Sequence, residues 1–295
     1  MPGKATNIRS SDGGEFSCYL VIPETEDPVP AIVLASAVHG VDADIRVIAD
    51  EFAARGFIVA APDLFWRSIP GPLSRHDDRA AQRSQPRLKK IKVGERDMAD
   101  TLAYLGTLPK FNGRAAAMGL CYGGPYAILG PKRLGYAAGI SCHGTQMLDY
   151  IQELDGVGEP ICIIWGDQDH RAPVEVLDAY RGIPSRMKNV EVHIFPGVLH
   201  GYMMRGSSKA FDPVTRDFSM ARAGDSRRSQ RRTRVAIAAS WVVNLRLAGI
   251  YERGWLFSNR HAPMIKGSAQ NRRRSDAESV SSIQFLGTRR HYGSL

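Results

Sequence analysis

The sequence predicts an α/β fold built on a mostly parallel central sheet with helices on its flanks. Short, continuous apolar runs such as residues 31–37 are typical of strands that are buried on both faces. They alternate with stretches of helical periodicity, for example residues 45–53, and this alternation indicates a parallel sheet with crossover helices. A chain of 295 residues with 43% hydrophobic content can bury a full core.

The expected elements form a regular series along the chain. A polar segment rich in Pro and Arg, residues 66–93, interrupts the series and is long for a connector, so we expect a functional excursion over one edge of the sheet. Strands are expected at 16–22, 31–37, 57–61, 115–120, 136–141, 161–165 and 190–195, and helices at 45–56 and 95–108, directly after residue 121, and after residue 175.

The formal net charge of +9 belongs to the end of the chain. Residues 1–222 contain 25 basic and 26 acidic side chains, whereas residues 223–295 contain 14 and 4. We therefore expect one domain over 1–222 and a basic, low-complexity tail over 223–295 that is disordered or foreign to the fold, as a shift of reading frame would produce. The last helix of such a fold would start at Asp217 and is expected to be lost, as the family resemblance described below implies. Nucleic-acid or membrane binding by the tail is the weaker alternative.

The four cysteines show neither Cys-x-x-Cys nor Cys/His metal spacing, so no metal site is expected. Cys18, Cys142 and Cys162 lie in or beside apolar runs and are expected to be structural thiols. No targeting segment and no apolar run of membrane-spanning length is visible. These observations favour a cytoplasmic, reducing location without membrane contact, which would keep Cys121 available as a thiol.

Residues 119–124, Gly-Leu-Cys-Tyr-Gly-Gly, lie between an apolar strand and a helical pattern. This is the nucleophile-elbow pattern with Cys121 in place of serine. Any side chain at 119, 123 or 124 would crowd so sharp a turn, and a helix N-terminus beyond it would favour a thiolate. A Gly-rich turn around a cysteine can equally be a plain connection, so further residues must decide.

Two later strand ends carry an acid and a base. Residues 166–173 contain Asp167 and Asp169, and His200 follows the last expected strand. The chain order Cys, Asp, His is the order of an α/β-hydrolase. Because parallel strands present their carboxyl ends at one edge, these residues are expected to meet there, which favours a catalytic Cys121.

With these residues in place, the chain resembles the dienelactone hydrolase family over residues 10–222. These α/β-hydrolases use cysteine where most relatives use serine. The resemblance rests on four motifs taken together, namely Gly-Leu-Cys-Tyr-Gly-Gly at 119–124, Gly-x-x-Asp-x-x-x-Pro at 166–173, His-x-Tyr at 200–202 and Ala-Pro-Asp-Leu at 61–64.

The resemblance implies Cys121 as nucleophile, His200 as general base and then acid, and Asp169 rather than Asp167 as the group that holds the imidazole. It also implies that the backbone N–H groups of Tyr122 and Val38 hold the oxyanion of an ester or lactone, and that water hydrolyses a thioester. Neither a metal nor an organic cofactor is required.

Two departures from the family pattern concern thiol activation and substrate. Ala37 stands where the family has a glutamate, so activation would rest on His200 and the helix dipole, with His39 either helping or only shaping the oxyanion hole.

The family binds a substrate carboxylate with two arginines. Arg79 matches the first arginine. Met204 occupies the position of the second arginine, and Arg205 lies one residue beyond it. Tyr202 of the His-x-Tyr motif is a further candidate for substrate contact.

The sequence thus predicts a cysteine-dependent hydrolase of small esters or lactones. A broad-specificity carboxylesterase or thioesterase is the alternative within the enzymes. A non-catalytic protein on the same scaffold, or a nucleic-acid-binding protein acting through its tail, is the alternative outside them. The oligomeric state and the natural substrate are not predicted.

Overall fold

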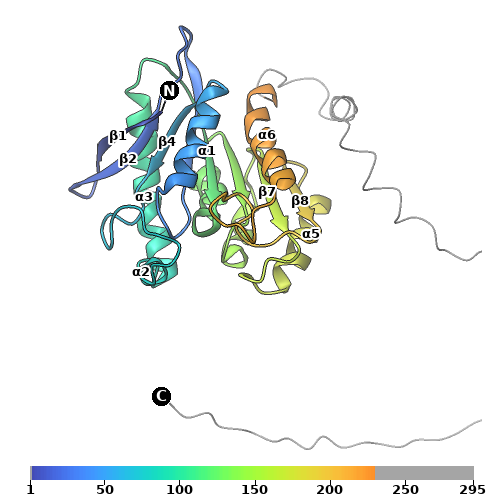
Figure 1. Ribbon diagram of the computed structural model, residues 1–295. Helices are drawn as coiled ribbons and strands as arrows, with labels where there is room; N and C mark the ends of the chain where they lie inside the picture. Colours follow the sequence, from blue (N-terminus) through green and yellow to red (C-terminus); the bar gives the residue numbers. More distant parts are fainter. Residues whose placement is uncertain (1, 230–295) are drawn as a thin grey trace, which may run out of the picture. The chain divides into compact units, whose positions relative to one another are not determined.

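A single eight-stranded sheet forms the centre of the computed structural model, which describes residues 2–229 (Figure 1). Six neighbouring strands run parallel, and two antiparallel strands extend the sheet at one edge. The strands are β1 (Lys4–Arg9), β2 (Glu15–Val21), β3 (Val29–Ala35), β4 (Ile58–Pro62), β5 (Phe111–Leu120), β6 (Ala138–Cys142), β7 (Ile161–Gly166) and β8 (Val190–Phe195), in the sheet order β1-β2-β4-β3-β5-β6-β7-β8. The predicted α/β fold with a mostly parallel sheet is confirmed.

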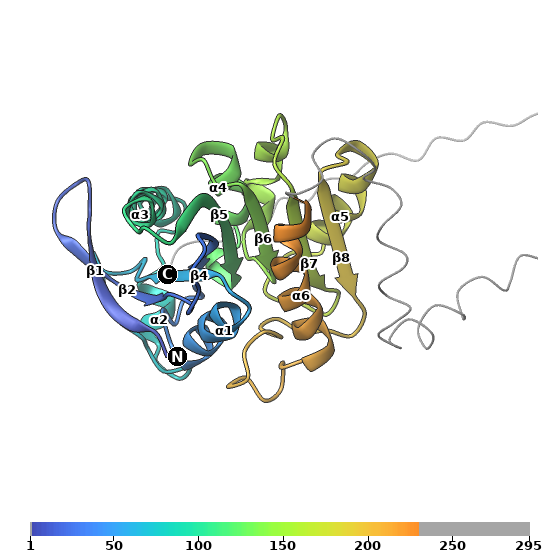
Figure 2. The same cartoon turned by 90° about the horizontal axis from the view of Figure 1, so that it is seen from above.

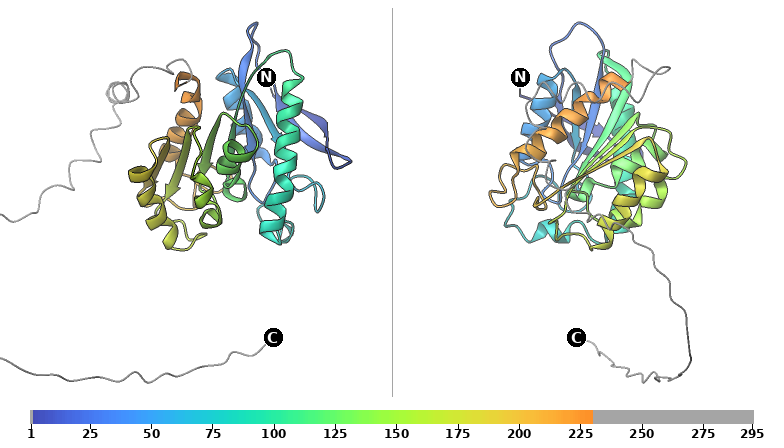
Figure 3. Two further views of the ribbon diagram at one scale, coloured as in Figure 1. Left: turned by 180° about the vertical axis from the view of Figure 1, so that it is seen from behind. Right: turned by 90° about the vertical axis from the view of Figure 1, so that its right-hand side faces the viewer.

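Helices cover both faces of the sheet (Figures 2 and 3). One face packs against α1 and α6, and the other against α3, α4 and α5, so the buried side chains form two apolar clusters, one on each face. The helices are α1 (Ala43–Ala54), α2 (Arg79–Gln82), α3 (Arg87–Gly106), α4 (Tyr126–Arg133), α5 (Glu175–Arg186) and α6 (Pro213–Ser229). Three short 3-10 turns join them, η1 (Cys121–Gly123), η2 (Met147–Asp149) and η3 (Ile151–Leu154).

Two elements differ from the sequence-based expectation near the start of the chain and in the excursion. Strand β1 was not predicted, because of its six residues only Ile8 is buried, so no alternating pattern marks it. Helix α3 begins at Arg87 and not at residue 95. Its buried face contains Ile91, Met98 and Leu105 at seven-residue spacing, but lysines surround the first of these and mask the pattern.

The expected loss of the closing helix is wrong. Helix α6 begins at Pro213, where the Asp212 carboxylate accepts a hydrogen bond from the Thr215 N–H at 2.7 Å. Met220 and Ala223 are buried against the sheet, so the helix has an apolar face despite its charged sequence. The predicted boundary at Arg222 falls inside this helix. Residues 230–295 lie outside the described part, and the expectations for the tail stay predictions.

Within residues 2–229, no helix has the length and apolar character needed to cross a membrane.

Candidate active site

Cys121 lies at the carboxyl end of the central strand β5, at the turn that leads into helix α4. Its backbone has φ of 53°, in the left-handed region that non-glycine residues rarely adopt. The Gly124 and Thr145 N–H groups donate to its carbonyl oxygen at 3.0 and 2.9 Å. The backbone of Cys121 is therefore held in a strained conformation by hydrogen bonds from two segments, as a nucleophile elbow requires.

The glycines of this turn are required by close approach of the backbone. A Cβ atom at Gly119 would collide with the carbonyl of Gly123, and a Cβ atom at Gly123 would collide with the carbonyl of Ala35 on the neighbouring strand β3. One at Gly124 would meet the Cα atom of Gly144. The expectation that side chains at 119, 123 and 124 would crowd the turn is confirmed.

The acid and the histidine come from the loops after β7 and β8. The Nδ1 atom of His200 lies 2.7 Å from Oδ2 of Asp169, whose side chain is fully buried, whereas 18% of the His200 side chain is exposed. The Arg171 N–H donates to the other Asp169 oxygen at 2.9 Å. The rival Asp167 instead accepts a hydrogen bond from the Gly197 N–H at 2.7 Å and so shapes the loop that leads to His200.

Electrostatics couple Cys121 to His200. Burial raises the pKa of the Cys121 thiol, but the hydrogen bond to His200 and the positive charges of His200 and Arg87 outweigh it, so the pKa is lowered from its ordinary 9.0. Burial lowers the pKa of His200, but the interactions with Asp169 and Cys121 outweigh this effect and raise the pKa from 6.5 to about 9. Both shifts act toward a thiolate beside an imidazolium, the form in which cysteine is a nucleophile.

His143, which the sequence analysis missed, lies against the same histidine. It follows β6, has φ of 40° and is buried, with its ring centroid 5.0 Å from those of His200 and Tyr202. Neither ring nitrogen has a hydrogen-bond partner among the described residues. Burial and the charge of His200 hold its pKa well below the usual range, so the ring is neutral. Its place directly after a parallel strand is the signal that could have identified it.

Two further arginines of the excursion contact backbone carbonyls, and Arg83 is buried whereas Arg87 is half-buried. Arg83 is 1% exposed and donates to the carbonyls of Val38, Ile69 and Gly71 at 2.8, 2.9 and 2.7 Å. Arg87 donates to the carbonyl of Tyr122, the residue after Cys121, at 2.9 Å. No pattern distinguishes these two arginines from their neighbours in a basic, polar segment.

The predicted arginine contacts to substrate lie at the surface. Arg79 is 60% exposed and pairs with Asp77, and Arg205 is 58% exposed and pairs with Glu51.

Of the other candidates for substrate contact, Tyr202 is buried and its hydroxyl lies 3.0 Å from that of Ser219 in α6. His39 is half-buried. Burial and the charge of Arg75 lower its pKa, and the negative charge of Asp42 opposes this effect in part.

The two predicted oxyanion donors come from the turn itself and from the segment after β3. The Tyr122 N–H lies against the Cys121 sulfur closely enough to lower the pKa of that thiol. Val38 follows β3, the strand beside β5, and its carbonyl is held by Arg83.

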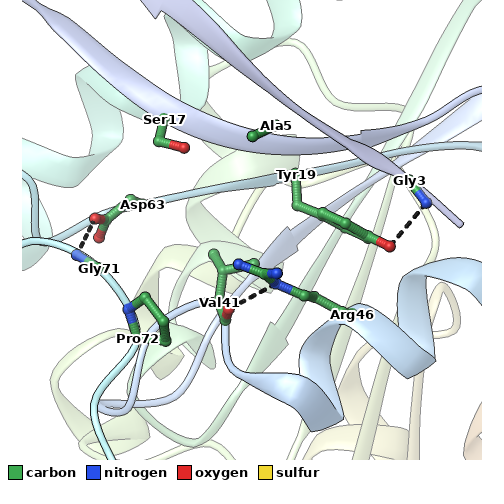
Figure 4. Close-up of a pocket in the computed structure, with 9 residues that line it drawn as sticks. All are labelled: Gly3, Ala5, Ser17, Tyr19, Val41, Arg46, Asp63, Gly71 and Pro72. Atoms are coloured by element: carbon green, nitrogen blue, oxygen red, sulfur yellow. Dashed lines mark hydrogen bonds between the residues drawn. The ribbon is translucent and has the colours of Figure 1, made fainter.

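Two other features lie apart from these residues. A small pocket of about 140 Å³ between β1, β2 and α1 is lined by Tyr19, Arg46 and Asp63 among others, and contains none of the predicted catalytic residues (Figure 4). Cys162, Glu191 and His193 lie within 4.8 Å of one another on β7 and β8, but Arg222 pairs with Glu191, so the cluster already contains a positive charge.

The sheet, the strained turn after its central strand and the acid–imidazole pair at the same edge are those of an α/β-hydrolase. More narrowly, the chain belongs to the dienelactone hydrolase family, whose family model matches residues 16–232. It is accordingly a hydrolase that acts on ester or lactone bonds.

Individual relatives agree with this assignment. The chain is 28% identical over 229 residues to carboxymethylenebutenolidase 1 of Cupriavidus pinatubonensis, covering 75% of this chain and 95% of the relative. It is 26% identical over 215 residues to the carboxymethylenebutenolidase of Pseudomonas putida, covering 70% and 89%. A putative dienelactone hydrolase from Klebsiella pneumoniae has a similar fold, with a TM-score of 0.64 at 17% identity over 75% of this chain and 95% of that one.

Proposed function

We propose that the protein is a cysteine-dependent hydrolase of small esters or lactones that uses Cys121, His200 and Asp169 as a catalytic triad. The observation that carries the proposal is a chain of three residues from separate strand ends: the Asp169 carboxylate lies 2.7 Å from the His200 imidazole, and His200 is close enough to Cys121 to lower the pKa of its thiol. Each member of this chain has the environment that its role needs: a buried acid, a partly exposed base and a sulfur of lowered pKa.

In the first half-reaction, the Cys121 thiolate attacks the carbonyl carbon of the substrate and a carbon–sulfur bond forms. The resulting oxyanion accepts hydrogen bonds from the backbone N–H groups of Tyr122 and Val38. As the carbon–oxygen bond to the leaving group breaks, the His200 imidazolium gives its proton to the departing oxygen. The products of this step are a thioester on Cys121 and an alcohol, or the enol that a lactone releases.

In the second half-reaction, neutral His200 takes a proton from water while that water attacks the thioester carbonyl. The carbon–sulfur bond breaks, the acid product leaves, and the thiolate–imidazolium pair is restored. Asp169 holds the imidazole with Nε2 toward sulfur and water and stabilises its positive charge in both halves.

The relatives named carboxymethylenebutenolidase support a lactone that carries a carboxylate as the substrate class. Arg79 and Arg205 would bind that carboxylate only by leaving their present partners, Asp77 and Glu51. A broad-specificity esterase, which needs no such contact, is therefore the second candidate.

The test is hydrolysis of a dienelactone and of an uncharged chromogenic short-chain ester by the full chain and by its Cys121→Ala variant. The expected result is turnover by the wild type and a loss of more than about 1,000-fold in kcat on removal of the sulfur. A ratio of kcat/KM that favours the dienelactone supports the lactone assignment, and the opposite ratio supports the esterase. Equal rates for wild type and Cys121→Ala would overturn the triad.

A further inference from the structure

Arg87, the first residue of helix α3, lies against the turn that contains the proposed nucleophile. Its Nη2 atom donates to the carbonyl oxygens of Tyr122 at 2.9 Å and Thr145 at 3.3 Å. Its guanidinium carbon lies 4.4 Å from the centre of the Tyr122 ring, in the geometry of a cation–π contact. One side chain thus contacts both the residue that follows Cys121 and the loop after β6.

These contacts fix the peptide groups on either side of Tyr122. The Cys121 carbonyl accepts hydrogen bonds from the N–H groups of Gly124 and Thr145, and Arg87 holds the Thr145 carbonyl as well as the Tyr122 carbonyl. Because a peptide group is planar, holding the Cys121 carbonyl also directs the Tyr122 N–H, the proposed oxyanion donor. Arg87 therefore tethers the network that sets the direction of this donor.

Charge is the second contribution of Arg87. Among the described residues it forms no ion pair with a carboxylate, and its buried Nε atom has no hydrogen-bond partner. Burial lowers the pKa of Arg87, and the acidic group that most opposes this effect is the Cys121 thiol, ahead of Tyr122 and Tyr150. A half-buried guanidinium without a carboxylate partner is stabilised by whichever anion forms nearby, and here that anion is the thiolate.

The other ionisable groups around Cys121 do not replace this cation. His200 faces the sulfur from the loop after β8, and its proton must leave and return during the reaction. His143, from the loop after β6, is neutral. Position 37, where the family pattern has a carboxylate, is the buried Ala37.

We propose that Arg87 is a positioning residue that stabilises the Cys121 thiolate with a permanent positive charge and holds the Tyr122 peptide in place. The inference deepens the proposed function and rests on it for the role of Cys121 as nucleophile. It concerns a residue in the excursion, and it assigns to that segment a part in the chemistry of the turn.

The experiment measures the rate at which iodoacetamide alkylates Cys121 between pH 4 and 10 in the full chain, with the reaction of the Cys121→Ala variant subtracted for the other thiols. In Arg87→Gln, the midpoint of this profile is expected to rise by about one pH unit, which makes alkylation about tenfold slower below the midpoint. For ester hydrolysis we expect kcat to fall more than KM changes, with recovery at higher pH.

Two further variants separate charge from folding. Arg87→Lys keeps the charge and is expected to retain the wild-type midpoint, although it loses the planar fork and some of kcat. Arg96→Gln removes an arginine of the same helix that is 52% exposed and pairs with Asp12, and it is expected to leave both the midpoint and kcat unchanged. Thermal melts identify any variant that has not folded.

An unchanged midpoint in folded Arg87→Gln, or equal shifts in Arg87→Gln and Arg87→Lys, would overturn the inference. Alkylation requires no substrate, so its outcome is independent of the proposed function. A shifted midpoint in a protein that hydrolyses no ester would leave Arg87 as a thiolate-stabilising residue and remove the hydrolase mechanism. Cys121-dependent hydrolysis with an unchanged midpoint would support the hydrolase mechanism and remove Arg87 as a thiolate-stabilising residue.

Discussion

The strand ends and the excursion over residues 66–93 contribute to the site in different ways. Cys121 directly follows a parallel strand, Asp169 and His200 lie in the loops after two others, and the strands themselves bring the three residues to one edge of the sheet. Arg83 and Arg87 come from the excursion and reach the site only because their guanidinium groups donate to backbone carbonyls. Topology therefore places the proposed reacting groups, whereas the packing of a loop and a helix start supplies the cations around them.

The largest expected effect on kcat concerns the acid at the strand ends. Asp169→Asn removes the charge that orients and stabilises the His200 imidazolium, and we expect kcat for ester hydrolysis to fall by about 1,000-fold or more. Asp167→Asn, two residues away, changes only the contact to the Gly197 N–H and is expected to lower kcat by less than about tenfold. Steady-state kinetics of the two variants make the comparison, and equal losses would mean that the structure pairs His200 with the wrong acid.

The second prediction concerns the backbone of the turn. Gly123→Ala places a Cβ atom against the Ala35 carbonyl, and we expect a loss of about 3 kcal/mol in unfolding free energy and of about 100-fold in kcat. The matched control is Gly182→Ala in α5, where a Cβ atom meets nothing within 4 Å and alanine favours the helix. Denaturant unfolding and ester kinetics test both, and a Gly123→Ala protein as stable as the control would contradict the close approach.

A third prediction sharpens the contrast within the excursion. Arg83→Met leaves the buried carbonyls of Val38, Ile69 and Gly71 without their donor, so we expect a loss of about 2 kcal/mol in unfolding free energy and a decrease of about tenfold in kcat through the Val38 loop. Arg79→Met, at an exposed pair, is expected to change the unfolding free energy by less than about 1 kcal/mol. Similar melting temperatures for the two variants would mean that the buried Arg83 stabilises the fold no more than the exposed Arg79.

The last prediction concerns the pH dependence of stability that comes from His200. Because its pKa is raised from 6.5 to about 9 in the folded chain, its protonated form stabilises the fold fully below pH 6.5, and that contribution is lost as the pH rises through about 9. The difference in unfolding free energy between wild type and His200→Ala should therefore shrink over this range. A difference that grows with pH would contradict the thiolate–imidazolium pair.

The sequence alone determined the fold class and the order Cys121, Asp169, His200, because apolar strands buried on both faces and glycines at a sharp turn leave direct marks in the residue pattern. It also carried the family resemblance. It did not determine β1 or the start of α3, where polar residues mask the buried face, nor the persistence of α6 beyond Asp217.

Only the tertiary structure decided which charged side chains belong to the site. Arg79, Arg83 and Arg87 lie within nine residues of one another, yet the first is exposed and the others are wholly or largely buried. His143 likewise gains its place from the packing of β6 beside the His200 loop. Burial of a long polar side chain depends on which backbone carbonyls the fold leaves within its reach, and no local pattern records that.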